Sequence, residues 1–293
     1  MTTWHDRVHS VNPFLTRENY SRRSITAYKI FTTLSWLLLV IVTVHYTFAK
    51  PHDGHHRHTI WGQNHHRHTP FALNSIITSI YWIVLFVLQL GYVWHLFSSN
   101  TDAVNAAANV GSHFIFNNLF YFAFVMLWVR SHFWIAELIL IINFFNLTAL
   151  YFRHSTLPRL IHIPVVSGPL AFNYVALFWV GAAMVNAHTL PARILANIAI
   201  WGILVYGGFY LIAFKDYTMG FALSVLAAAL GVAQFLTHVI AFQWIFAFVI
   251  MALLFIMTIL ISLPGALGEK IRYRQQGQVV SEDRERAPLL DDR

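Results

Sequence analysis

Long, uninterrupted apolar blocks are the feature that most limits how this sequence can fold. Blocks of about twenty mostly apolar residues recur along the chain, and that length matches a helix crossing a hydrocarbon core of roughly 30 Å. Because a bilayer supplies no water to the backbone, each block must satisfy its own hydrogen bonds as a helix. Hydrophobic residues make up 57% of the chain and charged residues only 11%, a balance that is unusual in a water-soluble domain. The sequence therefore predicts an all-α, polytopic transmembrane helix bundle.

We predict about eight membrane-spanning helices, with the ranges 27–49, 71–97, 111–129, 132–152, 165–187, 193–214, 218–238 and 240–263. Arg130-Ser131-His132 separates the third helix from the fourth, and Thr237-His238 separates the seventh from the eighth. Each of these joined regions is too long for a single crossing, which is why we divide it.

The distribution of lysine and arginine predicts that both termini lie in the cytosol. With the N-terminus inside, the inner side holds most of the nineteen Lys and Arg residues, and the outer side holds Lys50, Arg57, Arg67, Arg130 and Arg193. The predicted layout is a cytosolic segment at 1–26, a bundle at 27–263 with a lumenal loop at 50–70, and a disordered cytosolic tail at 264–293. The net charge of +7 fits contact with the anionic inner leaflet of the lipid bilayer, and no nucleic-acid partner is needed to explain it.

The lumenal loop is rich in histidine, and the letters HHRHT occur in it twice. Its histidines are His52, His55, His56, His58, His65, His66 and His68. Neutral imidazoles bind Zn²⁺ or Cu²⁺, but this spacing selects no single set of ligands. The loop therefore predicts either weak metal binding or a flexible polar connector. Because imidazole has an ordinary pKa of about 6.5, an acidic lumen would charge the loop and release bound metal.

One motif in this loop suggests an enzyme. His52-Asp53-Gly54-His55-His56 has the HxxHH spacing of membrane di-iron desaturases and hydroxylases. Those enzymes distribute several such boxes over different loops on the cytosolic side, whereas here the histidines gather in one loop on the predicted outer side. We therefore expect no enzyme activity and no cofactor beyond the weak metal binding.

Ionisable and polar residues within the predicted helices are candidates for function, because they are costly in a bilayer. Glu137 is the only acidic residue inside a predicted helix core. It is expected to pair with Arg130, to extend outward to the membrane surface, or to form a protonatable site at the outer mouth of the bundle, near His132 and His45. Asn117 and Asn143 belong to a set of amides expected to form hydrogen bonds between helices, with Asn118, Asn146, Asn173, Gln89 and Gln234.

Small and charged residues in the C-terminal half of the bundle predict packing and anchoring. Gly220, Ser224 and Ala228 recur every four residues, which predicts a packing face on one helix. Lys215, beside Asp216 at a predicted inner helix end, is expected to extend its ammonium group to the membrane surface.

The two tails carry short sorting motifs. Glu285 precedes Leu289 and Leu290 in the acidic dileucine pattern that clathrin adaptors read on cytosolic tails of vacuolar and lysosomal proteins. Asn12-Pro13-Phe14 matches the tripeptide that EH domains bind in endocytic sorting. The tails therefore predict clathrin-adaptor and EH-domain partners and a vacuolar or other endomembrane location, with the plasma membrane as the alternative.

Three stretches resemble a group of fungal multi-pass membrane proteins known only as a domain of unknown function. They are NPFLTRENYSRRSITAYKIF, LSWLLLVIVTVHYTF and LPGALGEKIRYRQ. The resemblance implies a fungal endomembrane protein and assigns no functional residue.

Two functions are compatible with these observations. The first is a transporter or channel-like protein for a small solute or ion, with Glu137, His45 and His132 at its outer end. The second is a non-transporting membrane scaffold or sorting partner that acts through its tails. If Glu137 and the asparagines face one cavity the first is favoured, and if they face a packed core the second is favoured.

Overall fold

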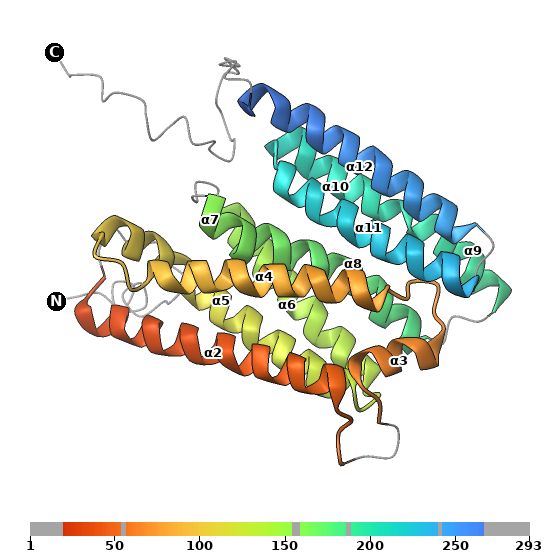
Figure 1. Cartoon of the computed structure of the whole chain (residues 1–293), viewed down its shortest axis with the longest axis horizontal. Helices are drawn as coiled ribbons and strands as arrows, with labels where there is room; N and C mark the ends of the chain where they lie inside the picture. Colours follow the sequence, from red (N-terminus) through yellow and green to blue (C-terminus); the bar gives the residue numbers. More distant parts are fainter. Residues whose placement is uncertain (1–19, 54–56, 154–158, 186–188, 240–241, 267–293) are drawn as a thin grey trace, which may run out of the picture.

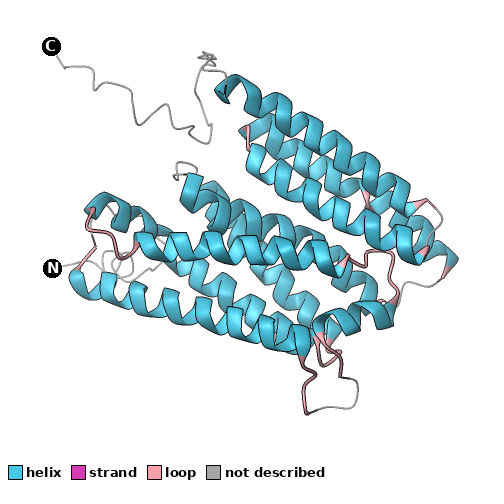
Figure 2. Cartoon of the chain, in the orientation of Figure 1, coloured by secondary structure: helices cyan, strands magenta, loops and turns pink. Residues whose placement is uncertain are grey.

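The computed structural model describes residues 20–53, 57–153, 159–185, 189–239 and 242–266, and all regular secondary structure within them is helical (Figures 1 and 2). Within these described residues, eight helical segments are long and apolar enough to cross a membrane. The predicted all-α, multi-pass fold is therefore confirmed.

Four of the spans lie in the first half of the chain, and the structure gives them the bounds α2 (Arg22–Phe48), α4 (Ser75–His95), α5 (Thr101–Trp128) and α6 (Phe133–Arg153). The fifth begins after the short helix α7 (Arg159–His162) and combines a π-helical turn, η1 (Ile163–Ser167), with α8 (Gly168–Met184). The last three are α9 (Leu190–Ala199) continued by α10 (Trp201–Phe214), then α11 (Tyr217–Thr237) and α12 (Gln243–Ala266).

Two predicted helix starts were wrong. Helix α5 begins at Thr101, well before the predicted residue 111, because the side chain of Asn100 accepts hydrogen bonds from the backbone of Asp102 and Ala103 and caps the helix. Helix α2 begins at Arg22, where Ser21 caps it, and so extends into the segment 1–26. Both predicted separations hold, because Ser131 and His238 adopt left-handed backbone angles that end α5 and α11.

The spans form two groups. The N-terminal group consists of α2, α4, α5, α6 and the α7–η1–α8 segment, and the C-terminal group consists of α9 to α12. In Figure 1 the C-terminal group lies above the N-terminal group, with α11 packed against α4 and α8.

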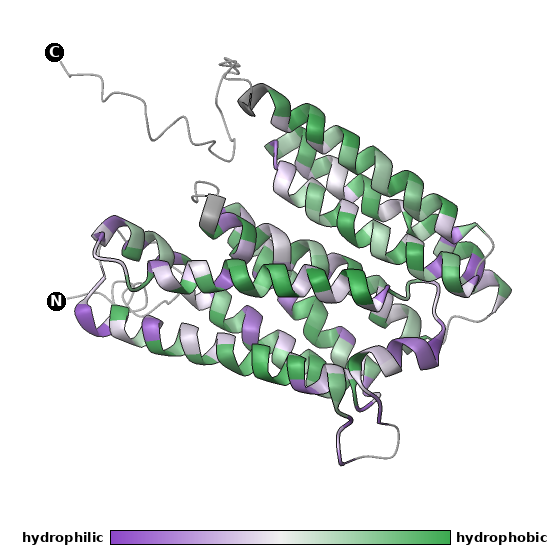
Figure 3. Cartoon of the chain, viewed as in Figure 1, coloured by the Kyte–Doolittle hydropathy of each residue, from purple (hydrophilic) through white to green (hydrophobic). Residues whose placement is uncertain are grey.

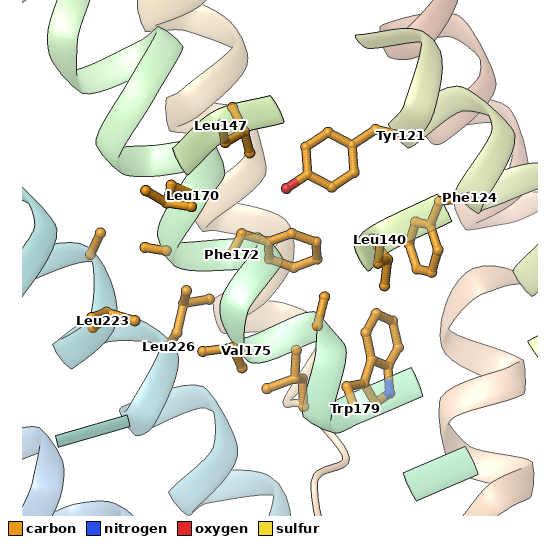
Figure 4. Close-up of a cluster of buried hydrophobic side chains, with 14 of the residues drawn as sticks. Tyr121, Phe124, Leu140, Leu147, Leu170, Phe172, Val175, Trp179, Leu223 and Leu226 are labelled. Atoms are coloured by element: carbon orange, nitrogen blue, oxygen red, sulfur yellow. The ribbon is translucent and has the colours of Figure 1, made fainter. Parts of the chain in front are cut away.

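Aromatic side chains fill the centre of the N-terminal group. Trp128 and Trp179 pack with ring centroids 4.4 Å apart, and Tyr121, Phe124 and Phe172 lie close by (Figure 4). Figure 3 shows that the helices carry mostly hydrophobic residues along their lengths. Large apolar side chains such as Phe48 and Trp94 point outward, which is the arrangement expected where lipid covers the surface.

Candidate functional site

An additional short helix closes one end of the bundle. Helix α3 (Ile60–Arg67) lies within the histidine-rich loop, at the end that carries the turn between α5 and α6, and we call this the outer end. The indole of Trp128 donates a hydrogen bond to the Ile60 carbonyl at 3.1 Å, and that of Trp179 donates to Asn64 Oδ1 at 2.8 Å. We call residues 57–74, which include α3, the outer cap.

The outer cap joins both helix groups. Asn64, which is buried, donates to the Leu73 carbonyl at 2.9 Å and so fixes the turn after α3. Gln234 of the C-terminal group donates to the Thr69 carbonyl at 3.0 Å. The backbone N–H of Asn74 in the outer cap donates to the Ala229 carbonyl of α11 at 2.9 Å. The outer cap therefore bridges α5, α8 and α11.

The prediction that this loop is a flexible connector was wrong for the described residues. Ile60, Gln63 and Asn64 are all buried, and their i, i+3 and i+4 spacing puts them on one helix face. That spacing was a signal for a docked helix, but the polar composition of the segment concealed it.

The histidines of the outer cap do not gather. His65, His66 and His68 are exposed, as is His52 just before the cap, and the His58 and His66 rings stack with centroids 4.7 Å apart. Within the residues that the structure describes, no group of three or more His, Cys, Asp or Glu side chains could hold a metal ion. His55 and His56 lie outside the described residues, so weak metal binding by the whole loop stays a prediction.

The pairing of Arg130 with Glu137 was also wrong. Arg130 instead makes a two-pronged contact with Asp53, with Nη2 to Oδ1 at 2.7 Å and Nε to Oδ2 at 3.0 Å. The hydrogen bond from Arg130 lowers the pKa of Asp53 below its ordinary value. Arg130 lies in the turn after α5, facing the segment that follows α2, whereas Glu137 faces α8.

Glu137 lies just below a cavity at the outer end. Its Oε1 is 3.6 Å from the position of a Cβ built on Gly181 of α8, and its Oε2 is buried without a hydrogen-bond partner among the described residues. One turn nearer the outer end, a cavity of about 370 Å³ opens between α6 and α8; it is lined by Arg67, Ser131, His132, Phe133, Trp134, Ile135, Ala183 and Met184. His132 lines this cavity, whereas Glu137 does not, and His45 packs on Tyr46 of α2 away from it.

Five asparagines form a hydrogen-bonded network in the middle of the N-terminal group. Asn143 of α6 donates to Asn117 of α5 at 3.0 Å and to Asn173 of α8 at 3.1 Å. Asn117 donates to Asn118 at 3.5 Å, and Asn118 donates to Ser35 of α2 at 3.4 Å. The amides therefore link four helices, as expected for polar residues between helices in lipid.

This network is closed on itself. Asn173 donates to the Leu140 carbonyl, and Asn146 donates to the His113 carbonyl. Oδ1 of Asn146 also lies within hydrogen-bond distance of Nδ1 of the His113 ring, at 2.8 Å. The side chains of Asn117, Asn118, Asn143 and Asn173 are fully buried, and each has a partner. Sequence reasoning missed His113, which sits one turn from Asn117 on the same face of α5. The amides face a packed core.

The end opposite the outer cap, which we call the inner end, holds a buried carboxylate. Lys215, which was expected to reach the membrane surface, is exposed, whereas its neighbour Asp216 is buried. Asp216 Oδ2 lies 3.0 Å from Nε2 of His162 and accepts from the Tyr151 hydroxyl at 3.1 Å. Its Oδ1 accepts from the Thr218 and Met219 amides, each at 3.0 Å, and so caps α11. A cap signal, an aspartate just before an apolar helix, was present in the sequence.

Burial and hydrogen bonding act in opposite directions on this carboxyl group. Burial raises the pKa of Asp216, but the hydrogen bond and the charge of His162, with the hydrogen bonds from Thr218 and Met219, outweigh it. The pKa of Asp216 therefore lies below its ordinary value, and the carboxylate stays ionised.

Together these features define the class: a multi-pass helical membrane protein with a capped outer end and polar contacts buried between its helices. Residues 193–290 match the family described as "fungal protein of unknown function (DUF1774)". That match covers the C-terminal group except for the first residues of α9, and it agrees with the resemblance drawn from the sequence. No curated protein and no solved structure matches the chain.

Proposed function

We propose that this protein is a non-enzymatic, non-transporting membrane scaffold or sorting partner of the endomembrane system. In this proposal the bundle is a stable anchor, and the two cytosolic tails carry the interactions. The vacuolar membrane is the proposed location.

The buried asparagine network is the observation that supports this proposal. A conduit needs polar groups directed at a shared water-filled path, because solutes and ions must exchange hydration for protein contacts. Here Asn117, Asn143 and Asn173 bond to one another, and no exposed surface is left on them. The outer cap, which covers the end of the bundle above this network, supports the same reading.

The proposed contact residues lie in the tails, outside the described residues. Glu285, Leu289 and Leu290 form the proposed clathrin-adaptor motif, and Asn12-Pro13-Phe14 forms the proposed EH-domain motif. Two leucines following an acidic residue in a charged segment suit recognition by a partner surface.

Localisation of the tagged full-length protein in a fungal cell tests this proposal. Leu289→Ala with Leu290→Ala is expected to move the protein from the vacuolar membrane to the cell surface. Val279→Ala with Val280→Ala is the matched control, because it removes another aliphatic pair from the same tail without an acidic residue four positions upstream. Unchanged vacuolar localisation of the leucine variant would contradict the dileucine assignment.

The position of Glu137 supports a second candidate function, in which the protein conducts protons or cations. Its carboxylate has a buried oxygen that makes no hydrogen bond within the described part of the chain, and it lies one turn below the cavity at the outer end. Proteoliposomes that contain the unmodified protein would then pass protons or cations, and Glu137→Gln would reduce that flux. Asp102→Asn is the control, because Asp102 is an exposed acidic residue at the other end of the bundle. Flux that equals that of empty liposomes removes this candidate.

A further inference from the structure

An apolar groove lies between α2 and α4, in the outer half of the bundle. Its volume is about 430 Å³, within the range of small-molecule sites. Residues 39–48 of α2 and 75–86 of α4 supply its walls, and Ile60 and Trp61 of α3 close its outer end. Its base is aromatic and includes Tyr121, Phe124, Phe172 and Trp179, which Figure 4 shows in the centre of the bundle.

The side of the groove opens toward the surrounding hydrocarbon. Both walls belong to membrane-spanning segments. The wall residues Val44 and Phe48 of α2, and Ile76, Ile80 and Ile83 of α4, are each more than half exposed. Exposed aliphatic and aromatic side chains on both rims place the mouth in the bilayer, so the molecules that reach it are lipids.

The few polar groups in the groove lie toward its outer end. Ser75 and Ser79 occupy the first turns of α4, and Thr43 and Thr47 lie on the last turns of α2. The Thr47 hydroxyl donates to the Thr43 carbonyl, whereas the hydroxyls of Ser75 and Ser79 make no hydrogen bond within the described residues. These two hydroxyls can bond to the ester region of a lipid near the membrane surface.

We propose that this groove binds one acyl chain of a bilayer phospholipid. The chain enters from the side and lies on the aromatic base, while the headgroup stays at the membrane surface and the ester carbonyls face Ser75 and Ser79. A flexible chain fits a groove closed by Ile60 and Trp61, because it can bend under them. A rigid sterol would have to bring its hydroxyl under that apolar closure, where the hydroxyl would lose its water contacts.

Photocrosslinking in a bilayer tests this inference. The full-length protein is reconstituted into nanodiscs with a phospholipid that carries a diazirine on one acyl chain, and the labelled residues are mapped after illumination. Label is expected to concentrate in residues 39–48 and 75–86, and unlabelled phospholipid is expected to compete with it. Ser79→Phe fills the groove, and about a tenfold loss of label at these residues is expected. That factor corresponds to a loss of about 1.4 kcal/mol in the binding free energy of the acyl chain.

Val87→Phe is the matched control. Val87 lies on the same helix and faces outward, but it does not line the groove, so labelling of the groove residues is expected to be unchanged. Thr47→Phe fills the groove from the opposite wall and serves if the Ser79 variant does not fold. Even labelling of all lipid-facing helices of the unmodified protein, or competition by cholesterol or ergosterol instead of phospholipid, overturns the proposal.

Discussion

The N-terminal and C-terminal helix groups hold together in different ways. In the N-terminal group, buried amides of α5, α6 and α8 bond to one another across the helices. In the C-terminal group, glycines let the helices approach closely. A Cβ on Gly207 of α10 would lie 2.7 Å from Leu254 of α12, and one on Gly220 of α11 would lie 2.6 Å from Leu211 of α10.

The difference shows two solutions to one physical problem. Lipid tails are as apolar as leucine, so helices in a bilayer gain little from burying apolar surface against each other. Specific hydrogen bonds or close backbone packing must therefore supply the association. Amides fix which residues face each other, whereas glycines fix how near two helices can lie.

Side-chain contacts join the two groups at several levels of the bundle. At the inner end, Asp216 of the C-terminal group pairs with His162 of the N-terminal group. In the middle, the rings of Tyr174 and Tyr206 stack with centroids 3.8 Å apart. At the outer end, Gln234 bonds to the outer cap. The groups are therefore expected to unfold as one unit as long as these contacts hold.

The largest effect is expected from Asp216→Asn. The variant places an amide where a carboxylate accepts from His162 and Tyr151, and breaking a buried pair of this kind costs about 3 kcal/mol. Unfolding is followed in mixed micelles that contain a rising fraction of denaturing detergent, and it is expected to change from one transition to two. A single, unshifted transition would show that this contact does not couple the groups.

The same variant has a defined pH dependence. The pKa of Asp216 is lower in the folded protein than in the unfolded chain. The contribution of its carboxylate to the free energy of unfolding is therefore complete at neutral pH and is lost as the pH falls below roughly 4. The difference in unfolding free energy between the unmodified protein and Asp216→Asn is therefore expected to shrink on acidification through that window. A difference that grows on acidification contradicts the lowered pKa.

Asn143→Leu tests the amide network of the N-terminal group. The substitution keeps the branched shape of the side chain but removes the donor to Asn117 and Asn173, and a loss of about 2 kcal/mol is expected. Asn197→Leu in the C-terminal group is the matched control. Asn197 Oδ1 is buried and has no partner among the described residues, so its removal is expected to leave the unfolding free energy unchanged or to raise it. Equal losses in both variants would remove the distinction between the groups.

Two adjacent glycines test the packing of the C-terminal group. Gly207→Ala places a methyl group against Leu254 and Leu223, and a loss of about 1 kcal/mol is expected, because leucine ends can move partly out of the way. The methyl group of Gly208→Ala meets no atom of the described residues within 4 Å, and this variant should be neutral or slightly stabilising. The same unfolding assay measures both variants, and a loss at Gly208 equal to that at Gly207 contradicts the close-packing account.

The smallest effect is expected from Asp53→Asn at the outer end. The partner of Arg130 is exposed, and exposed ion pairs are weak and screened by salt. The unfolding transition should not move, while protease cleavage near Arg57 should rise roughly twofold at low salt. Asp102→Asn at the inner end is the control. A shift of the whole transition would mean that the ion pair, rather than the Trp128 and Trp179 contacts, holds the outer cap in place.

The sequence located the spans and named many of the polar residues, but it did not give their partners. Asn117 and Asn143 were expected to bond between helices, and they do so. Gly220 and Ser224 were expected on a packing face, and they lie against α12, where Ser224 donates to the Met251 carbonyl. Pairing of Arg130 with Glu137 was one of the alternatives because the two residues are near in sequence, whereas the partner found, Asp53, lies far away along the chain.

What the sequence determined by itself is the set of membrane-spanning helices, because in a bilayer each apolar segment must satisfy its backbone within itself and the pattern is local. Helix α3, the closed asparagine network and the burial of Asp216 were decided only by the tertiary structure. Each depends on partners distant in the chain: Trp179 for Asn64, Asn173 for Asn143, and His162 for Asp216. The sequence alone does not specify whether a polar side chain contacts lipid headgroups, water or another helix, because the packing of the helices determines which of these it meets.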